Sequence, residues 1–211
     1  MSDRLLVLLH AAGQSPQMWQ DQVTALPPGF RAVAPWLHGL RPAKADTFDV
    51  ERAAAEVAQA LDLQGVRTAS VCGLSLGARV ALQFAIDHPD RCEALVLASP
   101  PARPPWSMRL ARQAAMRVLP KSVYRQQNVD KAKVIQAMRE VARIESVSGL
   151  EKVTARTLLL CGSEDPASER SAKALAERIN SAEVQTIAGA GHMINTDRPE
   201  DFNSALYEFL G

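Results

Sequence analysis

The stretch that decides the fold is ASVCGLSLGARVALQFAID, which occupies residues 69–87. Residues 69–72 form an apolar run typical of a buried strand, and residues 78–87 carry the amphipathic pattern of a helix. The Gly-Leu-Ser-Leu-Gly motif at residues 73–77 lies between them and predicts a tight turn from strand to helix. Such a turn strains Ser75 and lifts its hydroxyl clear of the sheet, to a helix N-terminus where free N–H groups favour negative charge. We interpret Ser75 as a nucleophile; an ordinary glycine-rich turn is the plainer alternative.

The same alternation of strand and helix runs through most of the chain. Further apolar runs predict strands at residues 5–9, 31–34, 94–98, 157–161 and 184–187. Further amphipathic patterns predict helices at residues 17–26, 50–61, 169–179 and 199–210. Strands that alternate with helices and are apolar throughout indicate a parallel sheet covered on both faces. We therefore predict an α/β fold with a mostly parallel central sheet of about six strands flanked by helices.

One region interrupts this alternation. It has no strand pattern, opens with several prolines, and carries helical patterns at residues 107–119 and 130–144. Residues 101–150 hold ten Lys and Arg against three acidic residues, whereas the rest of the chain holds 14 against 20. We interpret residues 101–149 as a helical lid inserted into a core formed by residues 1–100 and 150–211. A basic lid would steer an anionic substrate towards the site; the alternative is that its charges simply face water.

Composition, charge and cysteine content limit the classes of protein to which the chain can belong. With 211 residues, 47% hydrophobic and 22% charged, the chain has the size and make-up of one soluble globular domain. A net charge of +1 disfavours a nucleic-acid partner, and no apolar run is long enough to span a membrane. The three widely spaced cysteines, Cys72, Cys92 and Cys161, suggest neither a disulfide framework nor a zinc site and fit a reducing compartment. We expect a cytoplasmic protein; its oligomeric state stays open.

Two further residues complete a possible catalytic triad with Ser75. Asp165 follows the strand at residues 157–161, and His192 lies in a small-residue loop after the last strand. Because parallel strands build a site at their shared carboxyl edge, these side chains are expected to meet. In that arrangement Ser75 attacks, His192 acts as general base, and Asp165 orients the imidazole. Glu164 is the local alternative for the acid, and a simple Asx turn is the plainer interpretation of Asp165.

A developing oxyanion needs hydrogen-bond donors. The backbone N–H of Leu76, next to the nucleophile, is one candidate, and the N–H of Ala12 in the loop after the first strand is the other. Such donors each contribute about 3–4 kcal/mol of transition-state stabilisation. Residue type does not reveal a backbone donor, so the assignment of Ala12 rests on its position in the loop after the first strand.

Together these residues resemble the α/β-hydrolase superfamily, in its lid-bearing branch of esterases, lactonases and carbon–carbon hydrolases. Residues 73–77 are similar to the nucleophile elbow of that family, and residues 10–13 to its oxyanion loop. The loops that hold Asp165 and His192 are similar to its acid and histidine loops. Two departures stand out: Ala11 replaces the usual Gly, and Trp36 replaces the usual Asp. We also expect the opening antiparallel hairpin of the family to be absent, since the first apolar run resembles the oxyanion strand.

The resemblance implies a two-step reaction through an acyl-enzyme, with a small-molecule substrate and no metal or organic cofactor. We expect hydrolysis of a small carboxylic ester, lactone or thioester. Two alternatives remain: a cofactor-free lyase or carbon–carbon hydrolase that acts on an anionic substrate, and a non-catalytic binding protein of the same fold. Candidate substrate-binding residues are Trp36, Trp106, Arg109 and Met193, although we favour packing onto the core as the interpretation of the apolar lid side chains.

Overall fold

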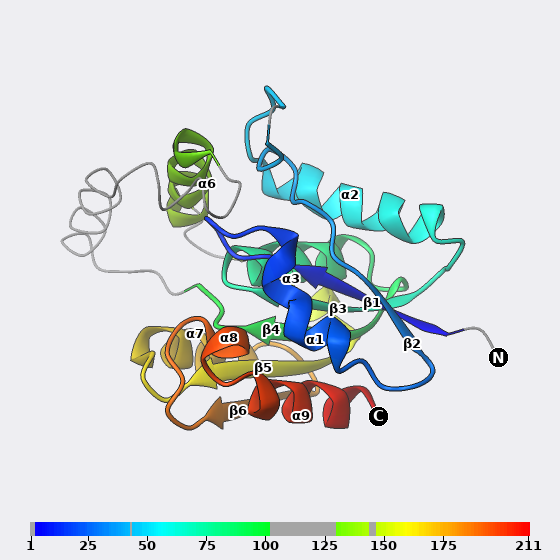
Figure 1. Cartoon of the computed structure of the whole chain (residues 1–211), viewed down its shortest axis with the longest axis vertical. Coiled ribbons are helices and arrows are strands. Elements are labelled where there is room, and N and C mark those ends of the chain that lie inside the picture. Colours follow the sequence, from blue (N-terminus) through cyan, green and yellow to red (C-terminus); the bar gives the residue numbers. More distant parts are fainter. Residues whose placement is uncertain (1–2, 43, 102–129, 144–146) are drawn as a thin grey trace.

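A parallel sheet of six strands forms the centre of the molecule (Figure 1). The computed structural model describes residues 3–42, 44–101, 130–143 and 147–211. The strand order is β2-β1-β3-β4-β5-β6, and every neighbouring pair is parallel. The strands are β1 (Arg4–Leu9), β2 (Phe30–Val33), β3 (Ala69–Leu74), β4 (Cys92–Ala98), β5 (Arg156–Gly162) and β6 (Ala182–Ile187). The predicted fold class is confirmed, and each predicted strand is present.

Helices cover both faces of this sheet. One face carries α2 (Val50–Leu63), α3 (Leu76–Asp87), α6 (Lys131–Arg143) and α7 (Pro166–Ala176). The other carries the 3₁₀ turn η1 (Pro16–Trp19), α1 (Gln20–Thr24), α8 (Ile194–Asp197) and α9 (Pro199–Leu210). A second 3₁₀ turn, η2 (Leu150–Lys152), leads into β5. Because both faces are covered, the central strands are apolar on both sides.

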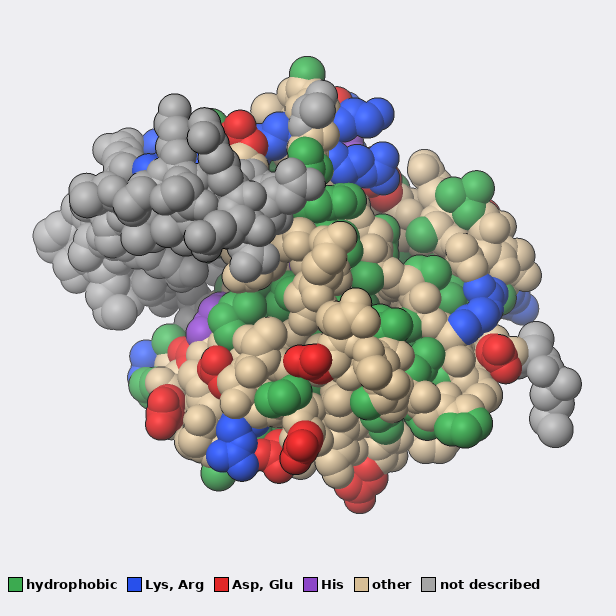
Figure 2. All heavy atoms as spheres, in the orientation of Figure 1, with side chains coloured by type: hydrophobic (Ala, Val, Ile, Leu, Met, Phe, Trp, Pro, Cys, Tyr) green, Lys and Arg blue, Asp and Glu red, His purple; other side chains and the backbone are tan. Residues whose placement is uncertain are grey.

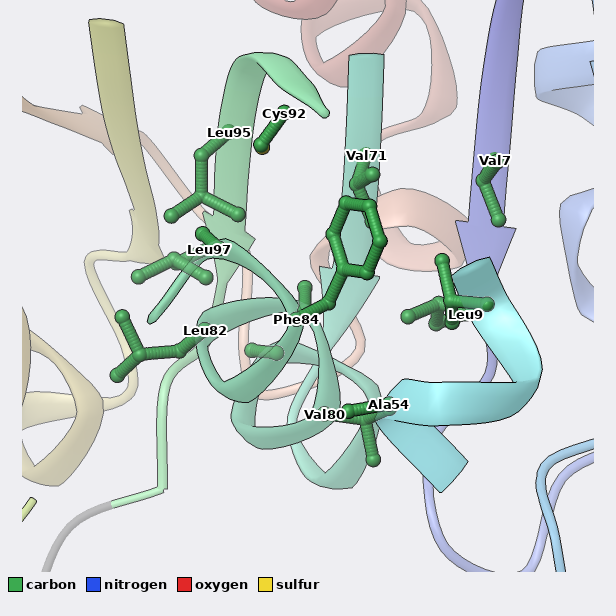
Figure 3. Close-up of a cluster of buried hydrophobic side chains, with 14 of the residues drawn as sticks. Val7, Leu9, Ala54, Val71, Val80, Leu82, Phe84, Cys92, Leu95 and Leu97 are labelled. Carbon is green, nitrogen blue, oxygen red and sulfur yellow. The ribbon is translucent and has the colours of Figure 1, made fainter. Parts of the chain in front are cut away.

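The two halves of the core follow from the alternation of side chains along each strand. Leu5, Val7 and Leu9 of β1 point into the cluster beneath α2 and α3, whereas Leu6 and Leu8 point into the cluster beneath α1 and α9. Figure 3 shows the first cluster, in which Phe84 of α3 packs between Val71, Val80 and Leu97. Phe84 and its counterpart Phe202 on the other face are fully buried, and each such side chain contributes about 2–3 kcal/mol.

Two helices differ from their predicted bounds by more than two residues or by a break. The helix predicted at residues 17–26 is split into η1 and α1. The helix predicted at residues 169–179 begins at Pro166 and ends at Ala176. It begins earlier because the Asp165 side chain accepts from the Ser168 N–H and Pro166 occupies the first turn, so these two residues define the helix start.

The predicted lid is described only in part. Of its two helical patterns, 130–144 forms α6, whereas 107–119, with Trp106 and Arg109, lies outside the described residues. The division into core and lid therefore stays a prediction. In Figure 2, Lys and Arg side chains gather near the top of the view, by the start of α2 and the segment that precedes it, and Asp and Glu side chains are more frequent over the lower half. Among the described helices, none is both long and apolar enough to cross a membrane.

The last strand, β6, lies at an edge of the sheet and, among the described strands, pairs only with β5. Its buried and exposed positions roughly alternate, and Glu183, Gln185 and Thr186 face solvent. The loop that follows β6 carries His192.

Candidate active site

Ser75 lies in the turn between β3 and α3, in a backbone conformation rare for a residue with a side chain. Its φ is 55° and its ψ is −110°, and its N–H donates to the carbonyl of Ala98 at 2.8 Å. The turn needs both neighbouring glycines: a Cβ on Gly73 would lie 2.2 Å from the Gly77 oxygen, and a Cβ on Gly77 would lie 2.1 Å from the Leu9 oxygen. The strain predicted for this turn is therefore present.

His192 lies within hydrogen-bond distance of Ser75 and Asp165 at once. Its Nε2 is 2.9 Å from Ser75 Oγ, and its Nδ1 is 2.6 Å from Asp165 Oδ2. An ionised carboxylate only accepts hydrogen bonds, so this geometry assigns the ring proton to Nδ1 and leaves Nε2 facing the hydroxyl. The structure thus brings together three side chains that the sequence separates by up to 117 positions.

The loop that holds His192 (the histidine loop) is hydrogen-bonded to the loop that holds Asp165 (the acid loop) and to α8. The N–H of Glu164 donates to the Ala190 carbonyl at 2.9 Å, and the N–H of Gly191 donates to Asp197 Oδ2 at 2.9 Å. A Cβ on Gly162 would lie 2.2 Å from the Ala190 oxygen, so the two loops are in close contact. This packing fixes the direction in which the imidazole of His192 points.

Asp165, and not the alternative Glu164, is the acid in contact with His192. Burial raises the pKa of the Asp165 carboxyl, but hydrogen bonds from Ser168 and His192 outweigh it, and the net shift of the pKa is downward. Glu164 is exposed, and its backbone, not its carboxylate, contacts the histidine loop. Sequence reasoning missed Ser168, whose one signal is its place three residues after an N-cap Asp.

The predicted oxyanion loop, residues 10–13, follows β1 and lies against the start of α3. A Cβ on Gly77 would lie 2.9 Å from the His10 oxygen, which places the loop against the turn that holds Ser75. Leu76 is the first residue of α3, so its N–H has no partner within the helix. Within the described part of the chain, neither this N–H nor that of Ala12 donates to a backbone carbonyl outside regular structure.

His10 holds the oxyanion loop from within the core. The ring is fully buried, its Nδ1 lies 3.0 Å from the Ala11 carbonyl, and its Nε2 accepts from the Leu37 N–H at 3.1 Å. Burial lowers its pKa to about 4, partly offset by the bond to Ala11. The imidazole is therefore neutral at pH 7, with its proton on Nδ1.

Trp36 and Met193 pack against different hydrophobic clusters. Trp36 meets the His10 ring edge-on, with 5.2 Å between ring centroids. It also packs with Ala12 and Met138 around Val134, which is 2% exposed. Met193 packs against the other half of the core. The predicted substrate-binding residues Trp106 and Arg109 lie outside the described residues.

Helix α6 is bound tightly to the segment that precedes α2. The Gln136 amide accepts from the Phe48 N–H at 3.0 Å and donates to the Phe48 carbonyl at 3.1 Å. Lys133 Nζ donates to the carbonyls of Arg41 and Lys44. These bonds hold Val134 over the oxyanion loop.

A buried polar network that the sequence did not reveal joins α1, α8 and α9. Gln22 Nε2 donates to Asn203 Oδ1 at 2.9 Å, and Asn195 Nδ2 donates to the Met18 carbonyl at 2.9 Å and to Gln22 Oε1 at 3.3 Å. The Tyr207 hydroxyl donates to the Gln22 carbonyl. The network ties the chain after His192 to the chain after the oxyanion loop.

The cysteines take no part in these contacts. Cys72, Cys92 and Cys161 are free and buried, and burial raises the pKa of each thiol, to about 12 for Cys92 and Cys161. Across the described ranges, no three His, Cys, Asp or Glu side chains gather as they would around a metal ion.

Comparison with known proteins gives consistent matches. A family model described as "Alpha/beta hydrolase family" matches residues 6–205. The chain is 27% identical over 246 residues to a putative carbamate hydrolase, RutD, of Caulobacter vibrioides, which covers 100% of this chain and 91% of that one. It is 40% identical over 94 residues to a pimeloyl-[acyl-carrier protein] methyl ester esterase of Aromatoleum aromaticum, covering 44% of this chain and 35% of that one.

Solved structures share the fold of this chain. An enol-lactonase of Burkholderia xenovorans superposes with a TM-score of 0.83 at 22% identity, covering 100% of this chain and 92% of that one. A hydrolase of Pseudomonas aeruginosa superposes with a TM-score of 0.79 at 25% identity, covering 99% and 90%.

Proposed function

The chain belongs to the alpha/beta hydrolase family and is a hydrolase, and we propose that it is a serine hydrolase that cleaves a small carboxylic ester, lactone or thioester. One observation carries the proposal: an unbroken hydrogen-bonded chain runs from Ser75 Oγ through His192 to Asp165, with lengths of 2.9 and 2.6 Å. These distances are those that a nucleophile, its base and the orienting acid require.

The chemistry proceeds in two steps. Ser75 Oγ attacks the carbonyl carbon while His192 Nε2 takes the hydroxyl proton. The imidazolium then gives that proton to the departing alcohol or thiol, which leaves an acyl group on Ser75. Water then attacks the acyl carbon while His192 Nε2 takes a proton from it. The bond from the acyl carbon to Ser75 Oγ breaks, the imidazolium returns the proton to Oγ, and the carboxylic acid departs. Every group in this reaction is a side chain, a backbone N–H or water.

Negative charge on the carbonyl oxygen is held by the N–H groups of Leu76 and Ala12 in this proposal. Support comes from the position of Leu76 at the start of α3, where the helix dipole adds to the N–H. The neutral His10 beneath the loop supports the second donor, because it holds the Ala11 carbonyl turned inward. Each donor contributes about 3–4 kcal/mol.

The substrate class rests on the relatives and on the side chains near the oxyanion loop. A methyl ester esterase, an enol-lactonase and a putative carbamate hydrolase share a carbonyl that bears a heteroatom leaving group. Trp36, Val134 and Met138 form an apolar wall beside Ala12, which favours an uncharged group at that position. A small molecule of this kind is the proposed substrate, and a cytoplasmic location stays our prediction.

A second candidate is a cofactor-free lyase or carbon–carbon hydrolase with an anionic substrate, in which Ser75 and His192 move protons. The observation in its favour is the excess of ten basic over three acidic residues in residues 101–150. Arg side chains suit carboxylates because their planar fork makes two parallel hydrogen bonds.

Active-site labelling tests the first proposal. A fluorophosphonate probe should label the wild-type protein and should not label Ser75→Ala. Ser70→Ala is the matched control, because Ser70 lies in β3, the strand that leads to Ser75, and its Oγ has no partner among the described residues; it should label as the wild type does. Turnover of short p-nitrophenyl esters should fall at least about 10³-fold in Ser75→Ala. A folded wild-type protein that is neither labelled nor active would exclude the serine-hydrolase proposal and leave the second candidate or a binding role.

A further inference from the structure

Ser168 makes two contacts with the carboxylate of Asp165, one to each oxygen. Its backbone N–H lies 3.2 Å from Oδ1, and its hydroxyl donates to Oδ2 at 2.5 Å. The same hydroxyl lies 3.4 Å from His192 Nδ1. Ser168 is 2% exposed, so water does not compete for these bonds. A hydroxyl in this position extends the hydrogen-bonded chain beyond the acid.

Local structure explains why this serine reaches the acid. Asp165 is the N-cap of α7, and Ser168 is the third residue of that helix, the position whose N–H an N-cap side chain accepts. The backbone N–H alone would satisfy the cap. The hydroxyl is therefore an addition that the helix start does not require.

Asp165 Oδ2 is shared between two donors, His192 Nδ1 at 2.6 Å and Ser168 Oγ at 2.5 Å. Each donor withdraws charge from the oxygen, so the hydroxyl weakens the attraction between the carboxylate and a protonated imidazole. The two bonds also prevent rotation of the carboxylate, because each oxygen is held separately.

We propose that Ser168 is a positioning residue, whose hydroxyl holds the Asp165 carboxylate towards His192 and moderates the proton affinity of the imidazole through the shared oxygen. The inference rests on the proposed function, since it assigns a role in the same site. It goes further by making the site a chain of four groups.

Other charged and titratable groups surround this site without touching either partner. On α7, Glu169 pairs with Lys173 at 2.7 Å in solvent. Cys161 of β5 directs its thiol to the Ser168 carbonyl at 3.6 Å. In the acid loop, Glu164 is exposed, and at α8 the Asp197 carboxylate accepts from the Gly191 N–H. Among the described contacts, none of these side chains bonds to the Asp165 carboxylate or the His192 ring. Removal of the Ser168 hydroxyl therefore leaves their own contacts unchanged.

The test compares Ser168→Ala, which removes the hydroxyl, with Ser168→Thr, which keeps it. Without the hydroxyl the carboxylate holds more charge, and the protonated imidazole is stabilised. In the pH profile of kcat/KM for p-nitrophenyl acetate, the midpoint of the acid limb should therefore lie about 0.5 pH unit higher in Ser168→Ala than in the wild type. At pH 7 kcat should fall by about tenfold with KM within twofold, and Ser168→Thr should restore both values.

A merely structural role would lower the midpoint of thermal unfolding and leave the acid limb in place. An unmoved or downward-shifted limb in Ser168→Ala, or equal losses in both variants, would overturn the proposal.

A second measurement separates this inference from the proposed function. NMR titration of the His192 ring, assigned by comparison with His192→Gln, needs no turnover. The ring should titrate at higher pH in Ser168→Ala than in the wild type, with Ser168→Thr close to the wild type. If the wild type is neither labelled nor active while the titration shifts as expected, the proposed reaction fails and the positioning of His192 by Ser168 stands. If labelling succeeds and the titration is unmoved, the inference fails alone.

Discussion

The side-chain amide of Asn195 donates to the backbone carbonyl of Met18, 2.9 Å away, although 177 residues separate them in sequence. Asn195 follows His192 by three residues, and Met18 follows the oxyanion loop and accepts the Ala11 N–H on its sulfur at 3.3 Å. A short series of contacts inside the core therefore joins the two loops that converge on Ser75.

Loss of this amide should destabilise the fold. Asn195→Leu leaves the Met18 carbonyl and Gln22 Oε1 buried without their donor, and we expect a loss of about 2–3 kcal/mol in the free energy of unfolding. Urea denaturation measures it. Gln20→Ala, on the exposed side of α1, is the control and should stay within about 0.5 kcal/mol. A loss in Asn195→Leu as small as that of the control would show that the network is dispensable.

The identity of the acid is tested by paired amide substitutions. Asp165→Asn should lower kcat by about 10²–10⁴-fold, because the amide no longer fixes the proton on His192 Nδ1. Glu164→Gln is the control, since its side chain is exposed and removed from the ring, and it should keep wild-type turnover. Steady-state assays with p-nitrophenyl acetate measure both. The reverse pattern would assign the acid to Glu164.

The turn before α3 should not tolerate a side chain at Gly77. A Cβ there would lie 2.1 Å from the Leu9 oxygen, a contact that only movement of β1 could relieve. We expect Gly77→Ala to cost at least about 4 kcal/mol or to prevent folding. In Gly65→Ala, the new Cβ meets nothing within 4 Å. Its cost should be only about 1–2 kcal/mol for the positive φ. Thermal unfolding of the two variants separates steric overlap from backbone strain.

Arg79 should be replaceable with a gain in stability. The side chain is 7% exposed and lines a pocket of about 490 Å³ between α2, α3 and η2. Burial lowers its pKa, against the effect of nearby Glu51 and Asp87. Its Nε and Nη1 have no partner among the described residues, and its remaining bond, from Nη2, runs to Gln83.

An apolar side chain of similar length removes those unpaired donors. We expect Arg79→Met to raise the free energy of unfolding by about 1–2 kcal/mol in urea denaturation. Arg67→Met, at an exposed ion pair with Asp90, serves for comparison and should change it by less than about 0.5 kcal/mol. Destabilisation by Arg79→Met would mean that its charge is satisfied in solution.

The loss of folding stability at acid pH should depend on His10. Its pKa falls from 6.5 to about 4 on folding. Between these values the unfolded chain binds the proton and the folded chain does not, so the free energy of unfolding decreases as pH falls from 6.5 towards 4. The full effect is roughly 3 kcal/mol. In His10→Gln, unfolding measured at pH 7 and pH 4.5 should differ by about 2–3 kcal/mol less than in the wild type. Equal differences in both proteins would contradict a buried, neutral His10.

Sequence alone could predict the sheet and the contacts among Ser75, Asp165 and His192, because these depend on local patterns. Apolar runs mark the strands, and parallel strands bring their carboxyl ends to one edge whatever lies between them. Even the weak run at residues 31–34 forms the edge strand β2. The start of α7 was misplaced because the amphipathic pattern begins later than the cap formed by Asp165.

The buried polar network and the contacts of Ser168 have no comparable pattern in the sequence. Gln22 and Asn195 are polar residues in amphipathic segments, and only the fold reveals that both are fully buried and hydrogen-bonded to each other. Ser168 is likewise one polar residue at the start of a helix, where serine is common for other reasons. The assignment of Trp106 and Arg109 to substrate binding remains a prediction.

The strand that leads to His192 also has an unpaired edge. None of the described strands pairs with the outer side of β6, so a strand added there by a neighbouring molecule would lie beside the segment that leads into the histidine loop. Glu183, Gln185 and Thr186 keep that rim charged or polar, which disfavours such self-association. The polar side chains that disfavour self-association at this edge therefore also disfavour the approach of a neighbouring molecule to the segment that leads to His192.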